Sequence, residues 1–270
     1  MIDNLQDRIQ EFQQQGATHL PGVFRDWVAG AREAIEENQQ HPSWRERTYK
    51  ADGNADNTAA FFQDYCVWNQ FDGYRALVQS SPMAEIAAAL MQSSTARIFH
   101  DHVLVKEAGN SVVTPWHQDK PYYLVNAEKT VSFWVALDPV PRERTIEYVG
   151  GSHRWGKDFK PQRFDGTDLY QGDVSEAVPD IDATRNELDI LGWAVEPGDA
   201  VAFQFGTLHG APANASPERR RVISFRWVGD DARFVKRQGT TSPAFPDLEY
   251  DDGAPFDAEE FPVIYSAEAK

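Results

Sequence analysis

The sequence predicts a mainly β domain with helices near its N-terminal end. Apolar residues recur at helical spacing in the first third of the chain. Beyond it, short β-branched and aromatic runs are separated by Pro/Gly turns. Short strands between turns are typical of a sandwich or barrel. No helix-length periodic segment alternates with these runs, which argues against a parallel βαβ sheet.

Three helices are predicted in the N-terminal third. The first carries apolar residues three or four positions apart and ends near a glycine. The second follows a Pro-Gly turn and has an apolar face between charged positions. The third opens on a Ser-Pro pair, which is a favoured helix start. The predicted ranges are 2–15, 24–40 and 81–91.

The predicted strands begin in the middle of the chain. Each is rich in β-branched and aromatic residues, and most are bounded by proline, glycine or asparagine. The predicted ranges are 97–106, 130–137, 200–205 and 220–228. Residues 158–186 are polar and poorly periodic, so we expect an insertion or a lid over a pocket there. The simplest organisation is a single domain over residues 1–270.

Composition narrows the classes of partner. The net charge of −16 argues against nucleic acid and anionic membranes as partners, because both bind clustered lysine and arginine. One cysteine, Cys66, cannot form an intrachain disulfide, which fits a reducing compartment. The first residues lack the basic and apolar regions of a signal peptide, and no apolar run reaches membrane-spanning length. We therefore expect a cytoplasmic protein.

The segment Thr114–Asp119 contains two potential metal ligands at strand spacing. Side chains two residues apart in an extended strand share a face, so His117 and Asp119 would project together. A second histidine, His209, lies far downstream. Two histidines and one carboxylate form the facial triad of non-haem Fe(II) oxygenases. A lone cysteine excludes a zinc site built from several thiolates.

The order of these motifs resembles the phytanoyl-CoA dioxygenase family. The motifs are His117-x-Asp119, Trp134, Gly150-Gly151-Ser152-His153, His209-Gly210 and Arg220. The resemblance implies a double-stranded β-helix, the jelly-roll relative of the cupins, that uses Fe(II) and 2-oxoglutarate. It extends over most of the chain, but no family motif lies beyond Val228.

The resemblance also assigns roles to individual residues. His117, Asp119 and His209 match the iron ligands. Arg220 matches the arginine that binds the distal carboxylate of 2-oxoglutarate, a task suited to a planar guanidinium. Three arginines, 219–221, are adjacent. Strand alternation puts Arg220 on one face with Val222, Ser224 and Arg226.

Other positions allow two interpretations, a role in the pocket or a structural role. Trp134 matches a tryptophan of the family's co-substrate pocket, but a strand tryptophan is equally a core residue. His102 and Lys106 lie at positions that resemble pocket-lining ones, and a structural role is as good an interpretation for each. Ala211 stands where many members have a small polar residue, so a hydrogen bond to 2-oxoglutarate would be missing.

The resemblance implies a dioxygenase that uses O2 to hydroxylate a small-molecule metabolite and releases succinate and CO2. The intact Asp119 disfavours halogenation, because halogenating relatives have a small residue there. Desaturation, cyclisation or epimerisation by the same oxidant stays open, as does a non-catalytic cupin-like metal-binding or sensing module. The sequence has no basic run suited to the phosphates of coenzyme A, and it leaves the substrate and the oligomeric state open.

Overall fold

The computed structural model describes residues 4–50, 59–163 and 166–267. None of the helices in these ranges is both long and apolar enough to span a lipid bilayer.

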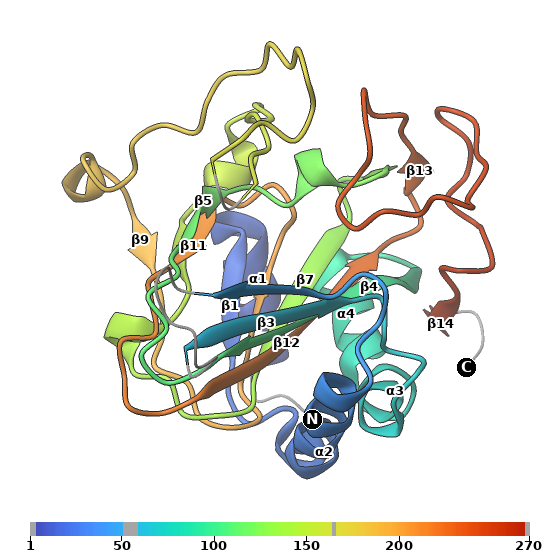
Figure 1. The fold of residues 1–270 in the computed structure, drawn as a ribbon. Helices are drawn as coiled ribbons and strands as arrows, with labels where there is room; N and C mark the ends of the chain where they lie inside the picture. The colour runs from blue at the N-terminus through green and yellow to red at the C-terminus, as the bar shows by residue number, and fades with distance from the viewer. Residues whose placement is uncertain (1–3, 51–58, 164–165, 268–270) are drawn as a thin grey trace.

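Two antiparallel sheets form the framework, with the longer strands crossing the centre of Figure 1. The larger sheet has eight strands, in the order β1 (Ala17–Leu20), β10 (Ala200–Phe203), β7 (Thr130–Ala136), β12 (Arg220–Val228), β4 (Thr95–Lys106), β3 (Ala60–Tyr65) and β2 (Arg47–Lys50), with β14 (Val263–Ser266) also paired to β4. The smaller sheet is β5 (Thr114–His117), β11 (His209–Ala211), β8 (Glu147–Val149) and β9 (Ile190–Leu191). A separate pair joins β13 (Arg233–Phe234) to β6 (Val125–Asn126).

Strand alternation divides the apolar side chains of the large sheet between two cores. In β12, Ile223, Phe225 and Trp227 pack into the cluster that contains the helices. Val222 instead joins Trp134 in a second cluster, between the sheets. Neither sheet closes on itself, and two antiparallel sheets packed around such a core form a jelly roll. The mainly β fold class is thus confirmed.

Four helices cover the outer face of the large sheet, and their apolar side chains belong to the same cluster as that face. They are α1 (Leu5–Gln15), α2 (Val28–Gln40), α3 (Asp72–Gln79) and α4 (Met83–Met91). In Figure 1, α2, α3 and α4 gather together below and behind the strands. The three predicted helices are confirmed over the described residues, although α2 is preceded by a 3-10 turn, Arg25–Trp27.

Several elements are absent from the sequence-based prediction. Helix α3 is only eight residues long, too short for a distinct periodic pattern. Strand β3 has every residue buried, so it lacks polar alternation. The C-terminal segment beyond Val228 adds β13 and β14, each four residues or fewer. Short elements of this kind depend on tertiary packing.

The C-terminal segment is anchored by an aromatic cluster. The ring of Phe99, on β4, lies 5.4–6.0 Å from the rings of Phe245, Phe256 and Phe261. It also contacts Tyr123 at 5.1 Å, in the T-shaped geometry that aromatic pairs favour. The segment therefore helps to fix Tyr123, whose hydroxyl reaches the site described below.

Helices α2 and α3 cross at a pair of glycines. A Cβ added at Gly73 would lie 2.0 Å from the backbone oxygen of Gly30, whereas one added at Gly30 would meet only the Cα of Gly73 at 3.7 Å. We expect Gly73→Ala to lower the free energy of unfolding by about 1–3 kcal/mol through overpacking. Gly30→Ala, the matched control, should be neutral or stabilise by up to about 1 kcal/mol, because alanine favours a helix. Chemical denaturation of both variants tests this, and equal effects would contradict it.

Candidate metal centre

Cross-strand pairing brings the two candidate histidines together. In the ladder between β5 and β11, His117 is the direct partner of His209. Asp119 follows the end of β5, in a helical conformation at the start of the Lys120–Tyr122 turn. The nitrogen and oxygen ligand atoms of the three residues all lie within 4.8 Å of one another.

The route by which Asp119 reaches the site differs from the expected one. The sequence suggested one extended strand through both His117 and Asp119, but the strand ends at His117. The amides of Asp119 and Lys120 both donate to the carbonyl of Phe205, at 2.9 and 3.0 Å. This pair of hydrogen bonds turns the chain so that the carboxylate faces the histidines.

Hydrogen bonds fix the tautomer of both histidines. Nδ1 of His117 lies 2.8 Å from the carbonyl oxygen of Pro115, and Nδ1 of His209 lies 2.9 Å from that of Thr207. A carbonyl oxygen only accepts, so each Nδ1 carries the proton and each Nε2 keeps its lone pair. Both Nε2 atoms face Oδ1 of Asp119, at 3.8 and 3.9 Å. Metal-binding histidines are commonly oriented in this way.

The two oxygens of Asp119 have different neighbours. Oδ1 faces the histidines, whereas Oδ2 lies 3.5 Å from Nη2 of Arg226 and 3.4 Å from Oγ of Ser132. Burial alone would raise the pKa of Asp119, but the charge of Arg226, followed by His209 and His117, outweighs burial and lowers this pKa to about 2. Asp119 is therefore ionised, with Oδ1 free to bind a cation.

The histidines are held in the neutral form that binds metals. Burial, followed by the proximity of His117, lowers the pKa of His209 to about 3. Burial also lowers the pKa of His117. Two neutral imidazoles and one carboxylate, gathered on one side, are a donor set that suits Fe(II) and leaves further coordination positions open.

Two cavities meet at this centre. The inner cavity, of about 70 Å³, lies between the sheets, and the outer cavity, of about 280 Å³, opens toward the surface. Both are lined by His102, His117 and Arg226. Asp119 lines the outer cavity, and His209 lines the inner one. A metal held by the three ligands would therefore be reachable from both sides.

The inner cavity contains two buried basic side chains. Arg220 and Lys106 are direct partners across β12 and β4 and are 7% and 2% exposed. Nη1 of Arg220 donates to the carbonyl of Arg144 at 2.7 Å, and Nζ of Lys106 donates to that of Val112 at 2.7 Å. Among the described residues, no carboxylate pairs with either cation. Buried charges require compensation, so the cavity favours an anion.

The pKa values of these cations reflect their environment. Burial, followed by the charge of Arg220, lowers the pKa of Lys106 to about 6. Burial, followed by Arg144, lowers the pKa of Arg220 to about 10. The hydroxyl of Ser224 lines the same cavity and, within the described part of the chain, is buried without a hydrogen-bond partner.

Several of the residues predicted from the sequence line the inner cavity. Alternation along β12 places Arg220, Ser224 and Arg226 in the inner cavity, as expected. Trp134 and His102 also line it, and each is a register partner of Ser224. The ring of His102 stacks on Tyr65 at 4.0 Å and its Nε2 lies 2.8 Å from Oε1 of Gln63. Ala211 also lines this cavity, and its methyl group offers no hydrogen bond, as the sequence indicated.

Other site residues were not singled out from the sequence. The outer cavity is lined by Arg47, Tyr65, Tyr122 and Tyr123, from segments that carry no motif. Lys106 was noted only as pocket-lining. Its place beside Arg220 depends on the register between β4 and β12, which the sequence does not state.

The segment 158–186 lies over the outer cavity, as expected for a lid. Six of its described residues line that cavity: Lys160, Gln162, Arg163, Gly166, Leu169 and Val178. The hydroxyl of Tyr122 holds this segment in place, because it donates to the carbonyl of Gln162 at 2.6 Å and accepts from the amide of Gln162 at 2.9 Å.

Solved structures with the same fold include several enzymes. The carbocyclase SnoK from nogalamycin biosynthesis, a non-haem α-ketoglutarate-dependent enzyme, superposes with a TM-score of 0.73 at 24% identity, over 96% of each chain. The epimerase SnoN from the same biosynthesis has a TM-score of 0.73 at 21% identity, over 97% of this chain and 98% of that one. EctD from S. alaskensis, solved with 2-oxoglutarate and 5-hydroxyectoine, has a TM-score of 0.65 at 18% identity, over 94% of this chain and 85% of that one.

Sequence comparisons are consistent with this fold. A probable phytanoyl-CoA dioxygenase of Caenorhabditis elegans is 28% identical over 148 residues, which are 53% of this chain and 46% of that protein. The match therefore spans less than half of that relative. The sequence model of the phytanoyl-CoA dioxygenase family matches residues 12–222. The chain belongs to the phytanoyl-CoA dioxygenase family.

Proposed function

We propose that this protein is an Fe(II)- and 2-oxoglutarate-dependent oxygenase that hydroxylates a small molecule. The observation that carries the proposal is the position of the His117, Asp119 and His209 cluster, which adjoins a cavity with two buried basic side chains, Arg220 and Lys106, that have no carboxylate partner among the described residues. The ligand cluster suits iron, and the basic cavity beside it suits a dicarboxylate that must reach the iron.

The iron would be held by Nε2 of His117, Nε2 of His209 and Oδ1 of Asp119. Bound Fe(II) and 2-oxoglutarate supply O2 activation, coupled to oxidative decarboxylation of the co-substrate to succinate and CO2. The protein contributes the orientation of the ligands. Both Nδ1–H groups are fixed by backbone carbonyls, and Oδ2 of Asp119 is held by Arg226 and Ser132.

The inner cavity would take the co-substrate. Arg220 would bind the carboxylate remote from the iron through its guanidinium, with Lys106 supplying a second charge. The hydroxyl of Ser224, which has no hydrogen-bond partner among the described residues, can donate to the same molecule. Trp134 and His102 line the walls and limit the width of the cavity. The substrate would enter the outer cavity, which described residues of the 158–186 segment line.

Hydroxylation is the outcome that we favour, since Asp119 is present and leaves no space for a halide ligand. A second candidate is ring closure or epimerisation, because SnoK and SnoN, which share this fold, are named for those reactions. A third is a non-catalytic metal-binding module. Turnover under ¹⁸O2 separates these outcomes: hydroxylation puts one labelled oxygen into the product, ring closure or epimerisation puts none, and a binding module produces no succinate.

The ligand assignment predicts the effect of single substitutions. Replacing Asp119 or His209 by alanine should reduce 2-oxoglutarate-dependent succinate release by about a hundredfold or more, because the iron loses a ligand. The visible absorption band of the anaerobic Fe(II)–2-oxoglutarate complex should weaken in parallel. Both are measured on purified protein with added Fe(II).

His41→Ala provides the matched control, since His41 is an exposed histidine outside both cavities. This variant should retain the band and the succinate release of the wild type. If Asp119→Ala kept wild-type turnover, the carboxylate assignment would be wrong. If the wild-type protein formed no band, the proposed function itself would be rejected.

The low pKa of Lys106 predicts a pH-dependent affinity for 2-oxoglutarate. At pH above about 6 the free protein holds Lys106 largely neutral, while a bound carboxylate would favour its charged form. Binding should therefore take up a proton, and the Kd should rise with pH above about 6, by up to about tenfold per unit. Below that pH, Lys106 is charged in both states and its contribution should not vary.

Calorimetric titration of anaerobic Fe(II) protein in buffers of different ionisation enthalpy measures the proton uptake. Lys106→Met should abolish the uptake and flatten the pH profile, whereas Lys236→Met, at an exposed lysine outside the inner cavity, should change neither. A wild-type Kd that stays constant as pH rises would exclude Lys106 from co-substrate binding.

A further inference from the structure

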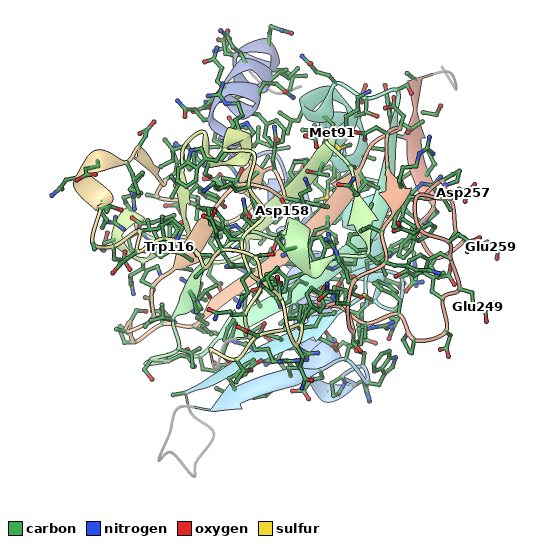
Figure 2. The ribbon with its side chains drawn as sticks, turned by 90° about the horizontal axis from the view of Figure 1, so that it is seen from above. Met91, Trp116, Asp158, Glu249, Asp257 and Glu259 are labelled. Carbon is green, nitrogen blue, oxygen red and sulfur yellow. The ribbon has the colours of Figure 1, made fainter. Side chains whose placement is uncertain are left out.

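The outer cavity has a charge balance opposite to that of the whole chain. Of its described lining residues, four are lysine or arginine and one is acidic, whereas the whole chain has 26 basic and 42 acidic residues. The acidic one is Asp119, which the candidate metal centre uses. Acidic side chains instead gather elsewhere: Figure 2 shows Glu249, Asp257 and Glu259 pointing outward at one edge, across the molecule from Trp116.

The four cations occupy two levels of the cavity. Arg226 is 5% exposed and lies beside Asp119, next to the metal centre. Arg47 of β2 and Arg163 of the lid are exposed, and Lys160 of the lid is 23% exposed. These three, the mouth cations, are thus the basic lining residues that reach solvent.

The mouth cations are only partly compensated. Lys160 pairs with Asp168 at 3.2 Å, and that carboxylate is 41% exposed. Arg163 donates to the backbone carbonyls of Asp168 and Leu169, which carry no net charge. Among the described residues no carboxylate pairs with Arg47, whose guanidinium lies 5.9 Å from the ring centre of Tyr65. Within the described ranges, only one of these three cations, Lys160, therefore has a carboxylate partner.

Between the mouth and the metal centre, the walls are mainly aromatic. They include Tyr65, Tyr122, Tyr123 and Trp116, and the ring of Tyr65 stacks on that of His102. Aromatic walls of this kind bind flat, apolar bodies. The volume of about 280 Å³ is near the lower end of the range for small-molecule pockets.

One buried polar atom in the wall lacks a partner. His100 is 1% exposed, and its Nδ1 lies 3.1 Å from the carbonyl oxygen of Asp101, so Nδ1 carries the proton. Its Nε2 is then an acceptor, and it has no hydrogen-bond partner within the described ranges. A hydroxyl or N–H group on a ligand in the cavity would satisfy it.

We propose that the outer cavity binds a small organic anion, with a carboxylate or phosphate between Arg47 and Lys160 and a flat body that bears a hydrogen-bond donor along the aromatic walls. This inference rests on the proposed function, because it places the oxidisable carbon of that ligand at the metal centre. Electrostatic focusing by the cavity would also draw an anion into an otherwise acidic protein.

Equilibrium dialysis against a matched pair of probes tests the charge preference. The protein is kept anaerobic with Fe(II) and saturating 2-oxoglutarate, so that the inner cavity is filled. The probes are para-coumarate, its neutral amide, and phenyl phosphate. We expect para-coumarate or phenyl phosphate to bind at least about tenfold more tightly than the amide, and the preference to shrink as salt rises from about 50 to about 500 mM.

The variant Arg47→Gln/Lys160→Gln should remove most of the preference for the anions while leaving the amide affinity unchanged. Lys236→Gln removes one charge from the exposed surface outside this cavity and should leave the preference intact. Equal binding of anion and amide by the wild type, or a preference that survives in the double variant, would overturn the inference.

The test is separable from that of the proposed function. Dialysis measures affinity and requires no turnover, whereas the Fe(II)–2-oxoglutarate band reports the metal centre. A normal band with no anion preference rejects the substrate class alone. A missing band rejects the proposed function, and the inference about an oxidisable substrate is rejected with it.

Discussion

The pairing of β5 with β11 is the constraint on which the centre depends. Because His117 and His209 are direct partners in that ladder, two residues 92 positions apart in the sequence are placed side by side by backbone hydrogen bonds. Each ring is then oriented by its own backbone carbonyl. Asp119 follows from the same strand, because the chain turns immediately after β5 and is tied to Phe205, close to the start of β11. A rigid ladder of this kind positions ligands more accurately than a flexible loop would.

Arg226 links this centre to the rest of the fold. Its guanidinium reaches Oδ2 of Asp119 at 3.5 Å, the hydroxyl of Tyr123 at 3.0 Å and the carbonyl of Ser224 at 3.2 Å. Burial alone would lower the pKa of Arg226, but the neighbouring Tyr123 and Asp119 outweigh it and raise this pKa. The cation therefore stays charged, and it holds one carboxylate oxygen while the other faces the histidines. Tyr123 is in turn packed against Phe99, so the aromatic C-terminal segment supports the site indirectly.

The sequence predicted what is local and missed what depends on register. His117 and Asp119 were recognised because two positions separate them, although the strand assumed to carry both ends at His117. Alternation along β12 correctly grouped Arg220 with Ser224 and Arg226, since period two is a property of the strand itself. The position of Lys106 opposite Arg220 could not be predicted from the sequence, because a shift of one residue between β4 and β12 would have placed Lys106 on the other face of the sheet. Arg47 carries no motif at all, and only packing brings it to the outer cavity, which the lid also lines.

Strand alternation also explains how one sheet serves both stability and chemistry. On β12, Ile223, Phe225 and Trp227 enter the helix-covered core, whereas Arg220, Ser224 and Arg226 line the inner cavity, so these two arginines stay out of the apolar layer. Arg220 and the protonated form of Lys106 carry a desolvation cost that no carboxylate of the described residues offsets. Large sheets can accept that cost, because the opposite face buries Ile223, Phe225 and Trp227 completely. An anionic co-substrate that neutralises these cations would then be bound and would also stabilise the fold, since a ligand that binds only the native state shifts the unfolding equilibrium.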